Sequence, residues 1–298
     1  MRNNIFERLQ QHGYNIGYEI CKIHDMFTGN LYHLKGYYDI LAEPKTIEEM
    51  VSMFSFHTWE QRGSLLSLEE FKNIVGIGTL IEAIYNEDVC CSENNNEIIL
   101  YLEYMLIVVM LAKKIDLSLG GNLHCDFKNY TAQLNEVHYR MLVQNILLMI
   151  DKMNLESHVL KEDEKIILVE KNATVTAVAE IVSDDLFCPV IEYNHHLLRG
   201  NIIRKREILK KFADDLEPRR KELKNLKKTA EDSLFYMFNK LNIRHNNNDI
   251  KEVANMNEEE LENWYDEIYQ LVLYCYLILE NNLRIEKLKN LQSKIENR

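Results

Sequence analysis

Hydrophobic residues recur every three or four positions over much of the chain, the spacing that places them on one face of an α-helix. This spacing predicts amphipathic helices over residues 46–62, 66–85, 130–153, 172–182, 201–216, 218–241 and 257–293. Residues 97–114 are apolar on nearly every side and predict a buried core helix. Three prolines and ten glycines are few for 298 residues, and strands and turns need more of them. The pattern therefore predicts a mainly α-helical protein.

A different pattern interrupts the helices near the middle of the chain. Two apolar stretches, 158–160 and 165–169, flank the charged residues 161–164, which is typical of a β-hairpin with a charged turn. We expect a bundle of two helical halves with a small β-hairpin near 157–170. The boundary near residue 155 separates an N-terminal helical region, 1–155, from a C-terminal helical domain, 156–298. One interleaved helical domain is the alternative.

The end of the chain predicts two long antiparallel helices joined by a polar loop. The loop residues 242–249 read Asn-Ile-Arg-His-Asn-Asn-Asn-Asp. Residues 184–189, which end in a proline, predict a break before these helices. Asn257 and the three glutamates after it predict the capped start of the last helix.

Charge is distributed unevenly along the chain. The formal net charge is −12, yet residues 199–228 hold twelve Lys or Arg against five Asp or Glu, a net of +7. Such a segment can attract an RNA backbone, dock on an acidic protein partner or on the chain's own acidic part, or form solvated helix faces. Arg204, Lys205 and Lys211 are the candidate contacts on this segment, and His195 precedes it.

Arg244 and His245 are the candidate catalytic pair. A neutral imidazole can accept the proton of a ribose 2′-hydroxyl, and a guanidinium can stabilise charge on the phosphate. Asn242, Asn246 and Asn247 would orient the RNA backbone as neutral donors. The alternative is a helix C-terminus, where cations are favoured and Asn tolerates the left-handed cap.

Other chemistry is disfavoured. Glu192 and His195 have the spacing used by di-iron bundles, but the sequence holds no second Glu-x-x-His, so we expect no metal. Glycine-rich phosphate loops and zinc-hydrolase motifs are absent, so we expect no cofactor. The six cysteines lack a CxxC spacing, the first residues lack an apolar leader, and no apolar run is long enough to span a membrane. We therefore expect reduced thiols in a cytoplasmic protein.

Several motifs in the C-terminal half resemble those of a known group of proteins. Residues 193–195 (Tyr-Asn-His), 198–202 (Leu-Arg-Gly-Asn-Ile), 205–209, 216–217 and 241–247 resemble bacterial proteins of abortive-infection type. The helical domains of that group are similar to the HEPN superfamily, which contains many metal-independent endoribonucleases. The resemblance covers about residues 170–295. It implies antiviral defence, RNA as substrate and a homodimer that brings two active motifs together.

The chain departs from the HEPN motif, which is Arg, four to six residues, then His. The positions that should hold His after Arg244 are Asp249, Ile250 and Lys251. Only Arg244 carries over, and His245 is a displaced substitute. Two hypotheses follow: a HEPN-like defence or toxin-type protein acting on RNA, and a non-catalytic helical interaction module. The module, an antitoxin or sensor subunit, would dock a partner through its basic segment.

Overall fold

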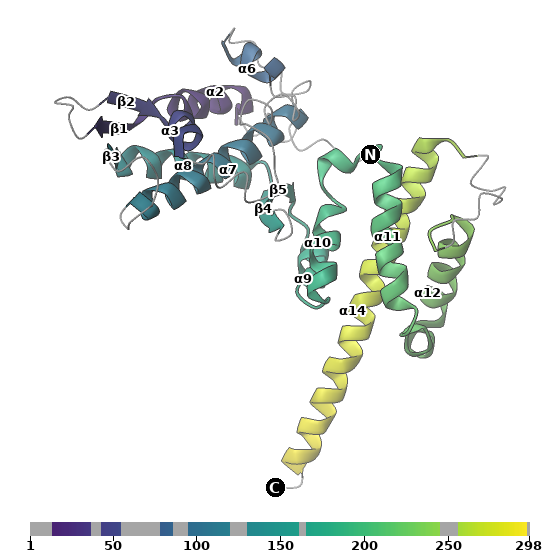
Figure 1. The fold of residues 1–298 in the computed structure, drawn as a ribbon. Helices are drawn as coiled ribbons and strands as arrows, with labels where there is room; N and C mark the ends of the chain where they lie inside the picture. Colours follow the sequence, from purple (N-terminus) through teal and green to yellow (C-terminus); the bar gives the residue numbers. More distant parts are fainter. Residues whose placement is uncertain are drawn as a thin grey trace. The chain divides into compact units, whose positions relative to one another are not determined.

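The computed structural model describes residues 14–36, 43–54, 78–85, 95–119, 130–160, 165–244 and 256–296. These residues form two compact units, Met1–Leu168 and Val169–Arg298 (Figure 1). The division falls inside the second strand of the hairpin, later than the expected boundary near residue 155. The predicted mainly α-helical class is confirmed.

The N-terminal unit is built around one buried helix. Its helices are α2 (Ile16–Phe27), α3 (Ile47–Phe54), α6 (Gly78–Tyr85), α7 (Asn95–Leu119) and α8 (Glu136–Lys152). Helices α3 and α8 pack against α7, whose side chains are buried almost without interruption from 98 to 112. The predicted buried core helix is thereby confirmed. Glu103 is the one acidic residue in this buried run, and its carboxylate accepts a hydrogen bond of 2.7 Å from the Leu168 amide.

The N-terminal unit also contains a three-stranded antiparallel sheet that the sequence pattern did not predict. Its strands are β1 (Asn30–Gly36), β2 (Glu43–Thr46) and β3 (Tyr130–Leu134), in the order β2-β1-β3. The prediction of helix from residue 130 is wrong for the first five residues. Asn135 Oδ1 accepts from the His138 amide at 3.2 Å, and this cap starts α8 only after the strand.

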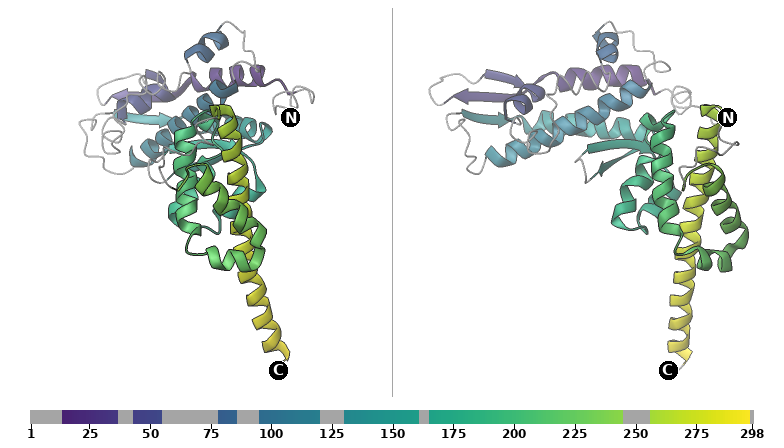
Figure 2. Two further views of the ribbon diagram at one scale, coloured as in Figure 1. Left: turned by 90° about the vertical axis from the view of Figure 1, so that its right-hand side faces the viewer. Right: turned by 45° about the vertical axis from the view of Figure 1, so that its right-hand side comes forward.

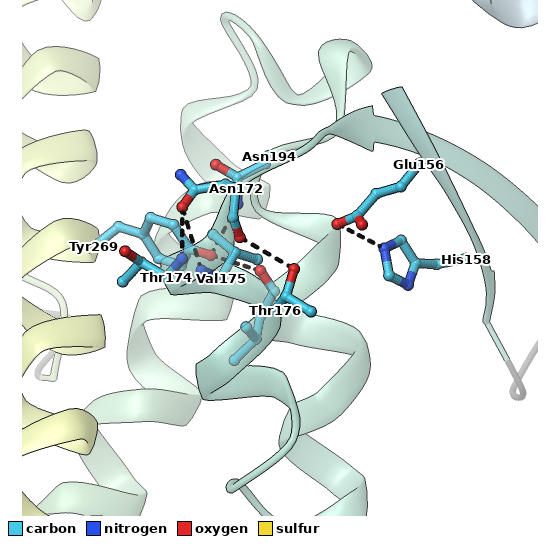
Figure 3. Close-up of polar contacts among 9 residues, drawn as sticks. Glu156, His158, Asn172, Thr174, Val175, Thr176, Asn194 and Tyr269 are labelled. Atoms are coloured by element: carbon cyan, nitrogen blue, oxygen red, sulfur yellow. Dashed lines mark hydrogen bonds and ion pairs between the residues drawn. The ribbon is translucent and has the colours of Figure 1, made fainter. Parts of the chain in front are cut away.

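The predicted hairpin is confirmed. It consists of β4 (Leu155–Leu160) and β5 (Lys165–Glu170). Within β4, the Glu156 carboxylate lies 3.2 Å from His158 Nε2 (Figure 3). After β5, Asn172 caps the next helix, because its Oδ1 accepts from the amides of Thr174 and Val175 (Figure 3).

The C-terminal unit is a bundle gathered around one long helix (Figures 1 and 2). Its elements are α9 (Ala173–Ala179), α10 (Asp184–Glu192), the short 3₁₀ helix η1 (His196–Leu198), α11 (Ile202–Leu216), α12 (Arg220–Lys240) and α14 (Glu258–Glu296). Helices α9, α11 and α12 all pack against α14. Tyr265 Oη donates to the Leu241 carbonyl at 3.3 Å, which joins the start of α14 to the end of α12. This contact fits the predicted antiparallel pair.

One local prediction for this unit is wrong. Residues 184–189 do not break the chain but form most of α10, with Pro189 inside the helix. Burial of Leu186, Val190 and Ile191 stabilises this helix despite the hydrogen bond that proline cannot donate. Helix α12 lies where the pattern predicted it, but Lys227 has non-helical angles (φ −152°, ψ 82°) and kinks it.

The tyrosines of α14 mostly line the core. Tyr265, Tyr269 and Tyr276 are buried, and Tyr274 is exposed. Three of these four rings are therefore inaccessible for stacking on a nucleic-acid base. Among the described helices, none combines the length and apolar character required to cross a lipid bilayer.

Candidate functional site

The end of α12 is a helix cap of the Schellman type. Asn242 directly follows the C-cap residue Leu241 and adopts the left-handed conformation (φ 56°). The Ile243 amide then donates to the Phe238 carbonyl at 3.1 Å, the bond that closes this motif. Ile243 and Phe238 are both buried, which supplies the hydrophobic contact that accompanies it. The position of Asn242 is therefore explained by backbone conformation.

Arg244 joins the ends of two helices. Its Nη1 lies 3.0 Å from Oε2 of Glu217, the C-cap residue of α11, and the Arg244 side chain is 20% exposed. The guanidinium thus already has an anionic partner. His245, Asn246 and Asn247 lie outside the described residues, so the pairing of Arg244 with His245 in a catalytic site stays a prediction.

Lys205 is an internal cation and not a surface contact. Its side chain is 5% exposed, and its ammonium lies 2.6 Å from Asp266 Oδ1 and 2.8 Å from Glu262 Oε1. The same ammonium lies over the ring of Tyr193 at 5.3 Å. Burial on its own raises the pKa of Glu262, but hydrogen bonds from Lys205 and from a backbone amide lower it below its ordinary value. Because this charge is buried and paired, the structure does not favour the predicted contact of Lys205 with RNA, which stays a prediction.

Two stacked tyrosines extend the network around Lys205. The rings of Tyr193 and Tyr269 lie 4.0 Å apart and nearly parallel. Tyr193 Oη donates to Asp266 at 3.1 Å, and Tyr269 Oη donates to the Val190 carbonyl at 2.6 Å. Asn194 Nδ2 donates to Tyr269 Oη at 2.9 Å (Figure 3). Burial, together with the charge of Asp266, raises the pKa of Tyr193, so its hydroxyl stays protonated as a donor.

The turn before α11 belongs to the same network. Gly200 has a φ of +76°, which a residue with a Cβ adopts only with strain, and its amide donates to Glu262 at 2.9 Å. Arg204 holds Glu192 through two hydrogen bonds of 2.8 Å and holds Glu207 at 3.1 Å. The predicted RNA contact of Arg204 therefore competes with a bidentate ion pair, and the Glu192 carboxylate that a metal would need is engaged by Arg204.

The sequence motifs between residues 193 and 209 thus fall largely on structural positions. The network ties α10, the turn at Gly200 and α11 to the first half of α14. His195 is also buried, pairs with Val169 in a β-bridge and contacts the ring of His196. Its burial removes it from the predicted RNA surface, whereas Lys211 is exposed as expected. Arg244 pairs near the opposite end of α11 from Arg204, about 20 Å along the helix axis.

Four exposed cations lie on α12, whereas the sequence favoured α11, where Lys211 is exposed. Lys221, Lys224, Lys227 and Lys228 are all exposed on the first part of α12 and its kink, and we call them the α12 lysine face. Among the described residues, none of the four has an ion-pair partner. The sequence held an indication of this, since Leu223 marks the buried side of the helix, and helical spacing turns Lys221 and Lys224 away from that side.

Comparison of the chain with models of protein families, with curated proteins and with solved structures finds no match.

Proposed function

We propose that the C-terminal unit binds RNA through the α12 lysine face. The carrying observation is the contrast between these four lysines and four other cations of the basic segment, which are paired with carboxylates. Arg204 and Lys205 are paired with carboxylates, and so are Arg219 with Glu222 and Arg220 with Glu231. The lysine face therefore keeps its positive charge. Lysines close together on one helix repel one another, and an RNA backbone relieves this repulsion while releasing its counterions.

The proposal belongs to the HEPN-like reading of the chain as an antiviral or toxin-type protein that acts on RNA. In that reading, the lysine face holds the strand, and the segment that begins at Arg244 carries any cleavage. The non-catalytic interaction module is the second candidate. It is supported by the ion pair between Arg244 and Glu217, because this pair occupies the one residue that matches the HEPN motif.

Salt dependence tests the binding proposal. We expect the affinity for a fluorescent single-stranded RNA to fall with a slope of about −2 to −3 in log K against log salt, since four contacts contribute ~0.7 each. Lys221→Glu/Lys224→Glu should weaken binding strongly and flatten this slope. Lys152→Glu/Lys294→Glu is the matched control, because both lysines are exposed and the change in net charge is the same. Equal loss in the two double variants would contradict a localised surface.

A second assay separates binding from cleavage. The same RNA is incubated with the protein in a metal chelator, and the products are examined for a cyclic phosphate. Cleavage that is lost in Arg244→Ala and His245→Ala would support the HEPN-like ribonuclease. Binding without cleavage would support the interaction module. An acidic peptide can also be used as a competitor. If it displaces the labelled RNA from the lysine face at a lower concentration than unlabelled RNA does, the result would point to a protein partner.

A further inference from the structure

The last part of α14 stands apart from the rest of its unit. Every residue from 283 to 296 is exposed, and this part of the helix extends beyond the other helices of the C-terminal unit (Figures 1 and 2). Isolated helices of this length are marginal in water. Five of the exposed residues are nevertheless large and apolar: Leu283, Ile285, Leu288, Leu291 and Ile295. Exposing this many apolar side chains to water is unfavourable, so the composition of the segment is that of one half of an interface.

Three of these apolar residues, Ile285, Leu288 and Ile295, follow the spacing of a coiled coil. Positions alternately three and four residues apart form one continuous stripe on the helix: Ile278, Asn281, Ile285, Leu288, Gln292 and Ile295. This alternation is the a/d pattern of a heptad repeat, which keeps one seam facing a partner helix. Leu283 and Leu291 are outside the stripe: Leu283 lies on the opposite side of the helix, and Leu291 lies at the edge of the stripe beside Leu288 and Ile295.

We propose that this stripe binds the same stripe of a second copy of the chain, in antiparallel orientation. The order of residue types along the stripe reads nearly the same in both directions. An antiparallel register that places Ile285 opposite Leu288 of the second copy also places Ile278 opposite Ile295. In that register Asn281 meets Gln292, so the two polar positions pair with each other and not with an apolar residue. A polar pair inside such a seam fixes register and orientation.

Charge favours the same orientation. Residues 278–286 contain Glu280, Arg284 and Glu286, a net charge of −1, whereas residues 287–296 carry a net charge of +2. Antiparallel pairing places the negative half of one helix beside the positive half of the other. Parallel pairing places the two positive halves together, and in a parallel coil Arg284 would lie beside Lys289 of the second copy. The contact is isologous, so it closes as a dimer with two-fold symmetry.

Sedimentation of the full chain from low to high micromolar concentration tests this surface. The wild type should show a monomer–dimer equilibrium, and Ile285→Glu/Leu288→Glu should weaken dimerisation by at least ~100-fold. The thermal midpoint of the monomer should stay unchanged, because both residues are exposed in the single chain. Leu283→Glu is the matched control and should dimerise as the wild type does. A monomeric wild type at every concentration, or equal effects of the two kinds of variant, would overturn the proposal.

Orientation is tested by disulfide cross-linking. A mixture of Asn281→Cys and Gln292→Cys chains should form a disulfide that joins positions 281 and 292, detected by peptide mass spectrometry. Neither variant alone should form a homodimeric disulfide at its new cysteine. The reverse result, efficient cross-linking of each variant with itself, would show a parallel pair and would refute the antiparallel register.

Discussion

Replacing Lys205 by methionine distinguishes two roles for this residue, a structural cation and a contact for RNA. The substitution keeps most of the aliphatic length of the side chain but removes the ammonium. Asp266 and Glu262 would then lose the charge that lies 2.6 and 2.8 Å from their oxygens. Breaking a buried ion pair in this way leaves anionic groups without compensation, which costs about 3–5 kcal/mol when burial is complete.

The geometry reduces this figure. Lys205 is 5% exposed, but the side chains of Glu262 and Asp266 are 20% and 49% exposed, so water can solvate part of their charge. We therefore expect a loss of about 2–3 kcal/mol. For a unit of this size, such a loss lowers the thermal midpoint by roughly 6–12 °C.

The assay compares urea unfolding and RNA affinity for Lys205→Met and Lys221→Met. Lys221 is exposed and unpaired, so its variant should stay within about 0.5 kcal/mol of the wild type and lose RNA affinity. Adding Glu262→Gln and Asp266→Asn to Lys205→Met should restore part of the stability, because no charge is then left unpaired. A Lys205→Met protein that is as stable as the wild type but binds RNA as weakly as Lys221→Met would refute the structural role of Lys205.

Two further predictions concern the same unit. Because Lys205 and a backbone amide lower the pKa of Glu262 in the folded state, its stabilising contribution is present above its unfolded value near 4.5. This contribution should be lost as pH falls through the lower folded pKa. The free energy of urea unfolding should therefore depend less on pH in Glu262→Gln than in the wild type over this acidic range. An equal dependence in the two proteins would contradict this role of Glu262. Asn242→Gly should leave stability nearly unchanged, whereas Asn242→Val should cost about 1–2 kcal/mol, because a β-branched residue is strained in the left-handed conformation. Equal melting temperatures for these two variants would argue against the cap.

Periodicity predicted the helices well because their apolar faces are continuous. The buried helix α7 and the basic helix α11 lie close to where the pattern placed them. The sheet was missed because each of its strands is short and its partners are distant in sequence: β3 pairs with β1 almost 100 residues earlier. Only tertiary pairing distinguishes residues 130–134 from the start of the amphipathic helix that follows them.

The candidate site was harder to predict because charge alone does not show which way a side chain points. The +7 segment contains both the buried Lys205 and the exposed Lys221, which have the same chemistry in the sequence. The difference arises from α14, whose Glu262 and Asp266 lie more than 50 residues away. A buried lysine requires such partners, and a single sequence does not reveal them. The end of α12 was predicted better, because the preference of Asn for a left-handed cap is local.

The ion pair between Arg244 and Glu217 sets a condition on any catalytic role. A guanidinium that stabilises a phosphate in the transition state has to release or share its carboxylate, which lies 3.0 Å away at the end of α11. RNA held first on the α12 lysine face would supply this competition, because a strand bound there raises the local concentration of phosphate near the same turn between α11 and α12. Binding would then precede release of Arg244 from Glu217. In the interaction module the pair would stay closed, and Arg244 would serve only to fasten the end of α12 to the end of α11.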